Sequence, residues 1–163
     1  MRALIPLLLA LPLAASAGDL DSRLQHQLSA RDGDVDCHAL IGDEGAAATR
    51  DALVHIADTV QRPPWVPLRA VGCVTAMAGA DPVALDAARR WVAIPGQPGL
   101  ALVVIGRSAD LSAPQALELA ELTATHHGQD PQHTLRIAES LRQSPHAGVR
   151  AVGDKLGSEP TTP

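Results

Sequence analysis

Prolines that directly follow short polar residues constrain this chain more than any other feature of its sequence. Asp81-Pro82, Asp130-Pro131 and Ser144-Pro145 each place a helix N-cap residue before a proline suited to the first helical turn. Ser112 is followed by Gln115 at the spacing of a capping box. Because each start leads into a stretch of Ala, Leu and Val at helical spacing, the sequence predicts a succession of helices.

The expected helices leave little of the chain for strands. They span residues 20–30, 46–61, 64–78, 82–93, 98–107, 112–126, 131–142 and 145–156. Residues 100–105, Leu-Ala-Leu-Val-Val-Ile, could form a short buried strand, since three of them are β-branched. The sequence offers no second strand to pair with this segment, so a fully buried helix is the better interpretation. We therefore expect an all-α fold.

The helix starts also recur at a nearly constant interval. The start of each helix and the start of the next helix but one are about 30–36 residues apart. This interval is the period of stacked helix pairs in an α-solenoid. A chain of 163 residues with 46% hydrophobic residues is suited to one globular domain. We expect that domain to span residues 18–157 and to contain seven or eight helices.

A short pattern repeats within this period: a proline, three variable residues, an aliphatic residue and an arginine. It occurs at 64–69, 131–136 and 145–150, and the tetrapeptide Arg-Ala-Val-Gly occurs at 69–72 and 150–153. We expect the aliphatic residue to pack between paired helices and the small residues to let a neighbouring helix approach. The arginine stem is expected to cover apolar surface while its charged head stays in water.

The segment 144–157 resembles the second helix of a HEAT repeat in its polar-Pro start, its Val149-Arg150 pair, its small residues and its later Leu-Gly. Residues 64–79 and 130–141 resemble the same helix more loosely. Residues 82–107 lack the Val-Arg pair, and Ala87 stands at the place of the arginine. Over about residues 64–157, the resemblance implies a short HEAT-like α-α superhelix. It also implies a scaffold that binds another protein and carries no catalytic residues.

The N-terminal segment is typical of a secretory signal peptide. One arginine is followed by an apolar run, and Ala15-Ser16-Ala17 supplies the small residues of a cleavage site. The run is too short, at about 12 residues, for a spanning helix, which needs roughly 20. We expect cleavage after Ala17 and a soluble periplasmic or secreted protein. The polar residues 158–163 are expected to form a disordered tail.

Cys37 and Cys73 are the only cysteines. An even number of cysteines in an exported chain favours a disulfide, with two free thiols or a metal site as the alternatives. Cys37-His38 lacks the second cysteine of a haem attachment motif, because Asp34 stands at the required position.

The net charge of −5 and the pI of about 5.7 argue against a nucleic-acid partner. The sequence also has no glycine-rich phosphate loop, so no nucleotide site and no cofactor are expected. The expected partner is another periplasmic or extracellular protein.

A histidine cluster supports an alternative function. His126, His127 and His133, with Asp130 between them, could hold Zn²⁺ or Cu²⁺ in a small metal-binding helical bundle. Adjacent histidines at a helix end point in different directions, however, and Asp130 is expected to cap the next helix. An exposed polar turn is therefore the favoured interpretation, and no metal site is assigned.

Asp32, Asp34 and Asp36 are spaced like the opening of a Ca²⁺ loop. An EF-hand loop needs Gly at its sixth position and Glu at its twelfth, where this chain has Cys37 and Asp43. The favoured interpretation is a solvated acidic linker.

His55 and Asp58, three residues apart on one helix, are the only basis for a hydrolase, and no GxSxG motif accompanies them. The two tryptophans are expected to serve packing: Trp91 in the core and Trp65 as a partly buried wedge between helices. The sequence thus predicts a non-enzymatic interaction or scaffold module.

Overall fold

The computed structural model describes residues 17–30, 35–130 and 132–158, and this part of the chain contains helices and no strands. The helices are α1 (Ala17–Ser29), α2 (Gly45–Thr59), α3 (Trp65–Met77), α4 (Pro82–Val92), α5 (Pro98–Ile105), α6 (Ala113–His127), α7 (Thr134–Arg142) and α8 (Ala147–Ser158), with a 3₁₀ turn η1 (Ser108–Asp110) between α5 and α6. The all-α prediction is confirmed, and the ambiguous segment 100–105 is the helix α5. The predicted signal peptide lies outside the described residues except for Ala17.

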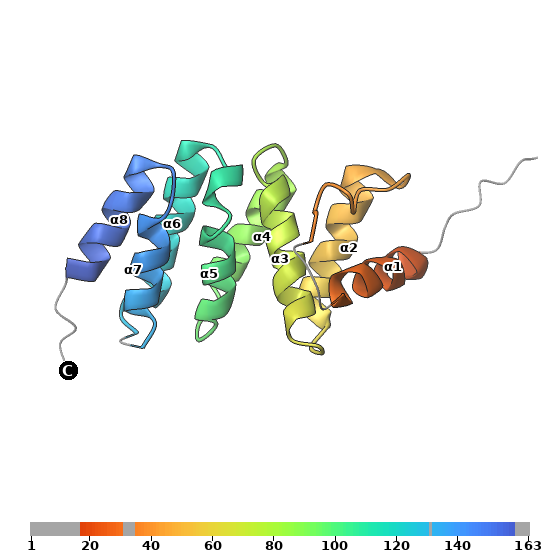
Figure 1. The fold of residues 1–163 in the computed structure, drawn as a ribbon, viewed down its shortest axis with the longest axis horizontal. Coiled ribbons are helices and arrows are strands. Elements are labelled where there is room, and N and C mark those ends of the chain that lie inside the picture. Colours follow the sequence, from red (N-terminus) through yellow and green to blue (C-terminus); the bar gives the residue numbers. More distant parts are fainter. Residues whose placement is uncertain (1–16, 31–34, 131, 159–163) are drawn as a thin grey trace, which may run out of the picture.

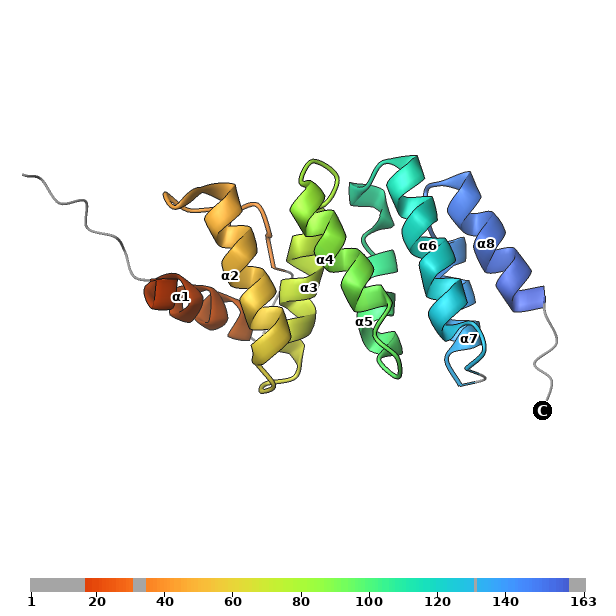
Figure 2. The same ribbon diagram turned by 180° about the vertical axis from the view of Figure 1, so that it is seen from behind.

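The helices stack in two layers along an elongated molecule (Figures 1 and 2). One layer contains α2, α4, α6 and α8, the other contains α3, α5 and α7, and α1 closes one end against α2 and α3. Every extensive helix–helix contact joins helices that are adjacent or next but one in the chain. This is the contact pattern of a solenoid, in which each unit touches only its neighbours.

The predicted caps explain where the helices begin. The Asp81 carboxylate accepts hydrogen bonds from the backbone N–H groups of Val83 and Ala84, and Ser112 and Gln115 form the capping box at α6. Asp130 caps a turn that lies before α7 and not the first turn of α7 itself. Its side chain accepts from the Gln132 N–H at 2.9 Å, so a turn precedes α7, which begins later than the prediction of residue 131.

The core runs along the whole stack, between the two layers. In α1, Leu20, Leu24 and Leu28 recur at four-residue intervals and are all buried. Each fully buried leucine contributes roughly 1.5–3 kcal/mol of transfer free energy. Trp91, among the largest fully buried side chains, confirms its predicted core position, and Trp65 is partly buried, as expected.

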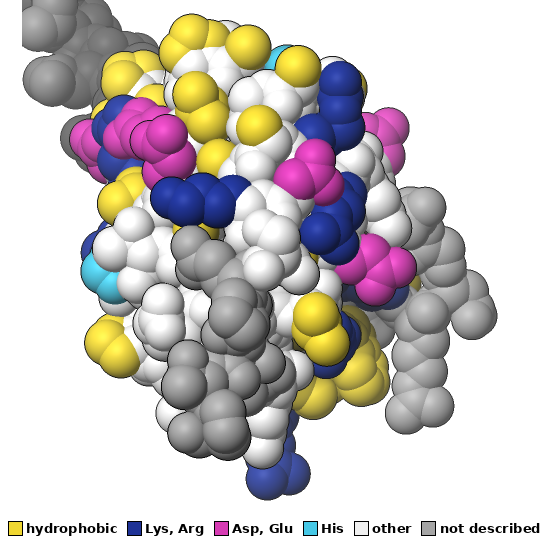
Figure 3. Space-filling view, turned by 90° about the vertical axis from the view of Figure 1, so that its left-hand side faces the viewer, with side chains coloured by type: hydrophobic (Ala, Val, Ile, Leu, Met, Phe, Trp, Pro, Cys, Tyr) yellow, Lys and Arg dark blue, Asp and Glu magenta, His cyan; other side chains and the backbone are white. Residues whose placement is uncertain are grey.

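The two ends of the stack are polar on the outside. The exposed side chains of α8 include Arg150, Asp154 and Lys155, while Asp19 and Arg23 are exposed on α1. Figure 3 views the α8 end, where charged side chains of both signs lie among hydrophobic ones that gather at the upper edge. Terminal helices of stacked repeats need such an outer face, because nothing packs over them.

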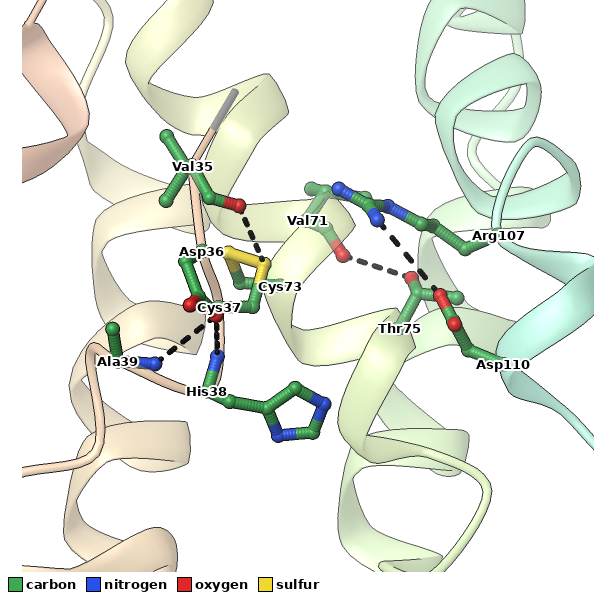
Figure 4. The surroundings of a disulfide bond; sticks show 10 residues. All are labelled: Val35, Asp36, Cys37, His38, Ala39, Val71, Cys73, Thr75, Arg107 and Asp110. Atoms are coloured by element: carbon green, nitrogen blue, oxygen red, sulfur yellow. Dashed lines mark hydrogen bonds and ion pairs between the residues drawn. A yellow bond between two sulfur atoms is a disulfide. The ribbon is translucent and has the colours of Figure 1, made fainter. Parts of the chain in front are cut away.

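The disulfide between Cys37 and Cys73 joins the segment before α2 to the middle of α3 (Figure 4). Both cysteines are buried, and this pairing confirms the predicted disulfide. A second link lies close by: the Arg69 guanidinium donates to the backbone carbonyls of Leu28 and Ala30 at the end of α1. The N-terminal helices are therefore attached to α3 by a covalent bond and by a charged group at a helix C-terminus.

The repeated sequence pattern does not occupy equivalent places in the structure. Val149 is buried, with 1% of its surface exposed, whereas Leu68 and Leu135 are 37% and 68% exposed. The prediction that the aliphatic residue packs between helices is therefore wrong for Leu68 and Leu135. The aliphatic residue falls at a different position in each helix relative to the first residue. Each residue of offset turns a side chain by about 100° around the helix axis.

The two glycines of the repeated tetrapeptide also differ. A Cβ on Gly153 would lie 2.8 Å from the Ala138 carbonyl oxygen and 2.9 Å from the Leu141 Cβ, so α8 packs directly on the α7 backbone there. A Cβ on Gly72 would meet its nearest neighbour, Arg107 Nε, at 3.6 Å, which is an ordinary contact distance. The expected close approach is confirmed at Gly153 only.

These glycines provide a matched pair of substitutions. Gly153→Ala is expected to lower the free energy of unfolding by about 1–3 kcal/mol, because the new methyl group overpacks the α7–α8 contact. Gly72→Ala is expected to leave it unchanged or raise it by up to about 1 kcal/mol, because alanine favours the helix interior. Urea denaturation of both variants measures the two changes, and a loss of similar size at both positions would show that the two glycines do not differ in their packing.

The disulfide closes a loop with a sequence separation of 36 residues. Replacing both Cys37 and Cys73 by alanine is expected to lower the free energy of unfolding by roughly 4 kcal/mol, since the unfolded chain regains the entropy of that loop. Guanidinium denaturation of the double variant measures the loss. The reduced wild-type protein serves as the control, and a loss of less than about 1 kcal/mol would show that the bond adds little stability.

Candidate functional site

The histidine cluster does not assemble into a ligand set. His127 is buried and its Nε2–H donates to the Val92 carbonyl oxygen at 2.8 Å, whereas His126 is exposed on the last turn of α6. His133 Nδ1 lies 2.8 Å from Asp130 Oδ2, and this hydrogen bond is the main reason that the pKa of Asp130 falls below its usual value. In the part of the chain that the structure describes, no three metal-ligating side chains come together.

The weaker candidates are also separated. His55 and Asp58 do not pair: His55 Nε2 lies 3.6 Å from Asp21 Oδ2, while Asp58 accepts a hydrogen bond from the Trp91 indole N–H. Asp36 caps a turn by accepting from the backbone of His38 and Ala39. Asp32 and Asp34 lie outside the described residues.

One serine–histidine cluster escaped the sequence analysis. The Ser108 hydroxyl donates to the Ser144 hydroxyl at 3.0 Å, and His146 Nε2 lies 2.9 Å from the Ser108 carbonyl oxygen and 3.1 Å from that of Leu111. A nitrogen that donates to carbonyl oxygens carries the proton, so it cannot take a proton from a serine hydroxyl. The cluster is therefore a clamp between η1 and the start of α8.

The surface between helices α2 and α4 is a stronger candidate site than the clusters above. They run in the same direction within one layer, yet their described residues make little direct contact. Two side-chain bridges hold them at their ends. Arg50 Nη1 pairs with Asp81 Oδ2 at 2.7 Å near the N-terminal ends, and Asp58 is bound by Arg90 and Trp91, each at 2.9 Å, near the C-terminal ends.

Between these bridges lies a hollow of about 720 Å³. Val54, Val83 and Ala87 supply its apolar part, and Val83 is 52% exposed. A second hollow, of about 660 Å³, lies between α1 and α2 and shares Asp51 and His55 with the first. We call the two together the α2 groove, lined by Leu20, Asp21, Glu44, Ala48, Asp51, Ala52, Val54, His55, Asp58, Thr59, Val83, Asp86, Ala87 and Arg90.

Carboxylates outnumber cations around the α2 groove. The seven ion pairs of this region involve seven carboxylates but only four arginines and His55. Arg50 is shared by Asp51 and Asp81, and Arg89 is shared by Asp86 and Glu118. A hollow lined with a surplus of one charge concentrates the field of that charge, so the α2 groove attracts cations.

Asp81 carries two structural roles with one carboxylate. Burial would raise its pKa, but the hydrogen bonds from Arg50 and from the Ala84 and Val83 amides outweigh that effect and hold the pKa below its ordinary 3.8. The ionised side chain therefore caps α4 and bridges it to α2 across the neutral pH range.

The sequence contained a partial signal for this site. Asp51, His55 and Asp58 recur at four- and three-residue intervals, so they share one face of α2. Nothing in the sequence indicated that Val83 and Asp86 would face them from α4, because that contact depends on how α2 and α4 are placed in the stack.

None of the described helices combines the length and the apolar character needed to cross a membrane. Comparison of the chain with protein-family models, with curated proteins and with solved structures found no significant match. The α2 groove is therefore the feature of the molecule from which a function can be inferred.

Asp81→Asn tests the bridge between α2 and α4. Asparagine is a good N-cap, so the change removes mainly the charge paired with Arg50, and we expect a loss of about 1 kcal/mol at pH 7. The folded-state pKa is depressed, so the contribution of Asp81 is complete above the unfolded value of 3.8 and is lost as the pH falls through the folded value. The difference from wild type should therefore shrink below pH 3.8.

Denaturation curves at pH 7, 4 and 3 measure this difference. Asp154→Asn is the control, because Asp154 pairs with Arg142 in an exposed position and should contribute less than about 0.5 kcal/mol. A difference between wild type and Asp81→Asn that grows as the pH falls would contradict the assignment.

Proposed function

We propose that this protein is an exported, non-enzymatic protein-interaction module that binds its partner through the α2 groove. The observation that carries the proposal is the groove itself, in which the exposed side chain of Val83 and the partly buried one of Val54 lie among a surplus of carboxylates. A patch with an apolar centre and a polar rim is the usual organisation of a protein–protein interface.

The exposure of Val83 supports this choice of surface. Val83 is one of three large hydrophobic side chains that are exposed among the described residues, and it lines the hollow of about 720 Å³ between α2 and α4. The other two, Leu68 and Leu135, belong to the opposite layer. An aliphatic side chain inside a hollow offers a partner more buried contact area than one on a convex surface.

The stacked helices and the disulfide support the remaining parts of the proposal. Stacked helix pairs present long surfaces for other proteins, which agrees with the HEAT resemblance of residues 64–157. A buried disulfide and the signal peptide predicted at residues 1–17 favour export to the periplasm or the cell exterior. No observation favours the metal-binding bundle, since His127 and His133 are engaged in separate hydrogen bonds and His126 is exposed.

Site-specific photo-crosslinking in the native host tests the proposal. A photoreactive amino acid at Val83 is expected to give one discrete crosslinked protein. The same amino acid at Leu135, which is more exposed but lies on the opposite layer, should not give this product. Adding Asp51→Lys and Asp86→Lys should weaken the Val83 crosslink. No product at Val83, or the same products at both positions, would overturn the proposal.

A further inference from the structure

We infer that the ligand of the α2 groove is a short, extended, basic peptide segment with one aliphatic side chain. This inference rests on the proposed function and names the chemistry of the partner. The aliphatic side chain would lie on Val54, Val83 and Ala87, and lysine or arginine side chains would reach the carboxylates on either side.

Two carboxylates face the α2–α4 hollow from opposite helices. Asp51 on α2 and Asp86 on α4 both line it, and their side chains are 66% and 71% exposed. Arg50 and Arg89 donate to the Oδ1 atoms of these aspartates, and each arginine also serves a second carboxylate. The second oxygen of each aspartate is thus available to an incoming cation.

The dimensions favour an extended backbone over a helix. The bridges at both ends of the hollow are direct side-chain contacts of 2.7–2.9 Å, so a third helix of about 10 Å diameter could not enter between α2 and α4 there without breaking them. The nine-residue interval from Asp81 to Arg90 corresponds to about 13 Å along a helix, which an extended peptide covers in about four residues.

The groove also imposes a direction on the charges. Arg90 lies at the Asp58 end of the hollow and is paired with Asp58 at 2.9 Å, so that end has no surplus negative charge to attract a cation. Asp51 lies seven residues before Asp58 on α2, and Asp21 on α1 and Glu44 at the start of α2 continue the acidic lining. The basic residues of the ligand are therefore concentrated toward the N-terminal ends of α2 and α4.

A defined peptide tests this chemistry with the full chain. The probe is fluorescein-labelled Lys-Lys-Leu-Lys-Lys, and its binding is followed by fluorescence anisotropy at low salt. A Glu-Glu-Leu-Glu-Glu peptide is expected to bind at least tenfold more weakly, and a peptide with glycine for leucine several-fold more weakly. Affinity should fall as salt rises from 0.02 to 0.2 M, because exposed charges are screened over roughly 10 Å at 0.1 M.

Matched variants locate the binding. Asp51→Lys with Asp86→Lys is expected to weaken binding at least tenfold, and Asp51→Asn with Asp86→Asn serves the same purpose if the lysine variant does not fold. The control is Glu121→Lys with Glu139→Lys, which changes the net charge equally at two exposed positions outside the α2 groove and should alter affinity less than twofold. Asp58 and Asp81 stay intact, because they hold α2 and α4 together.

Each outcome decides the inference. Equal binding of the acidic peptide, no binding of the basic peptide, or equal loss in the groove and control variants would overturn it. A crosslinked partner at Val83 without basic-peptide binding would overturn this inference and leave the proposed function standing. Basic-peptide binding at the groove, lost in the Asp51/Asp86 variants, would support the ligand chemistry. If no crosslink formed at Val83 as well, the proposed partner protein would be overturned and the peptide-binding groove would stand.

Discussion

Mutual burial of short helices is the constraint on which the whole molecule depends. In the described part of the chain no helix is longer than 15 residues, and isolated helices of that length are marginal in water. Each helix is therefore stable because its neighbours cover its apolar face. The contacts that do so are local in the chain, so the stack grows in one direction and needs polar faces on α1 and α8.

The same principle explains the α2 groove. Where two helices of one layer pack fully, the surface between them is closed. Between α2 and α4 the connection is made by Arg50–Asp81 at one end and by Asp58 with Arg90 and Trp91 at the other. Side chains that would otherwise be buried by a neighbouring helix remain accessible there, and the carboxylates that form the bridges also set the sign of the local field.

Local features of the chain were predictable because their causes are local. A capping side chain bonds to amides two or three residues away, so Asp81 and Ser112 mark helix starts that the structure confirms. The pairing of two cysteines needed only their number and the expected compartment. The predictions that failed concern the direction in which a side chain points. Leu68 and Leu135 share a sequence pattern with Val149 but are exposed, because the pattern does not show where each helix begins.

The sequence by itself determined the fold class, the helix positions and the disulfide. Helix capping and hydrophobic periodicity depend only on residues that are close in the chain, and two cysteines allow a single pairing. The tertiary structure alone decided which histidines form hydrogen bonds, which glycine packs against the backbone of a neighbouring helix and where the groove lies. These depend on the rotation and spacing of helices that are distant in the chain. A shift of one residue turns a side chain by about 100°, so only the assembled stack places Asp51 and Val54 opposite Val83 and Asp86.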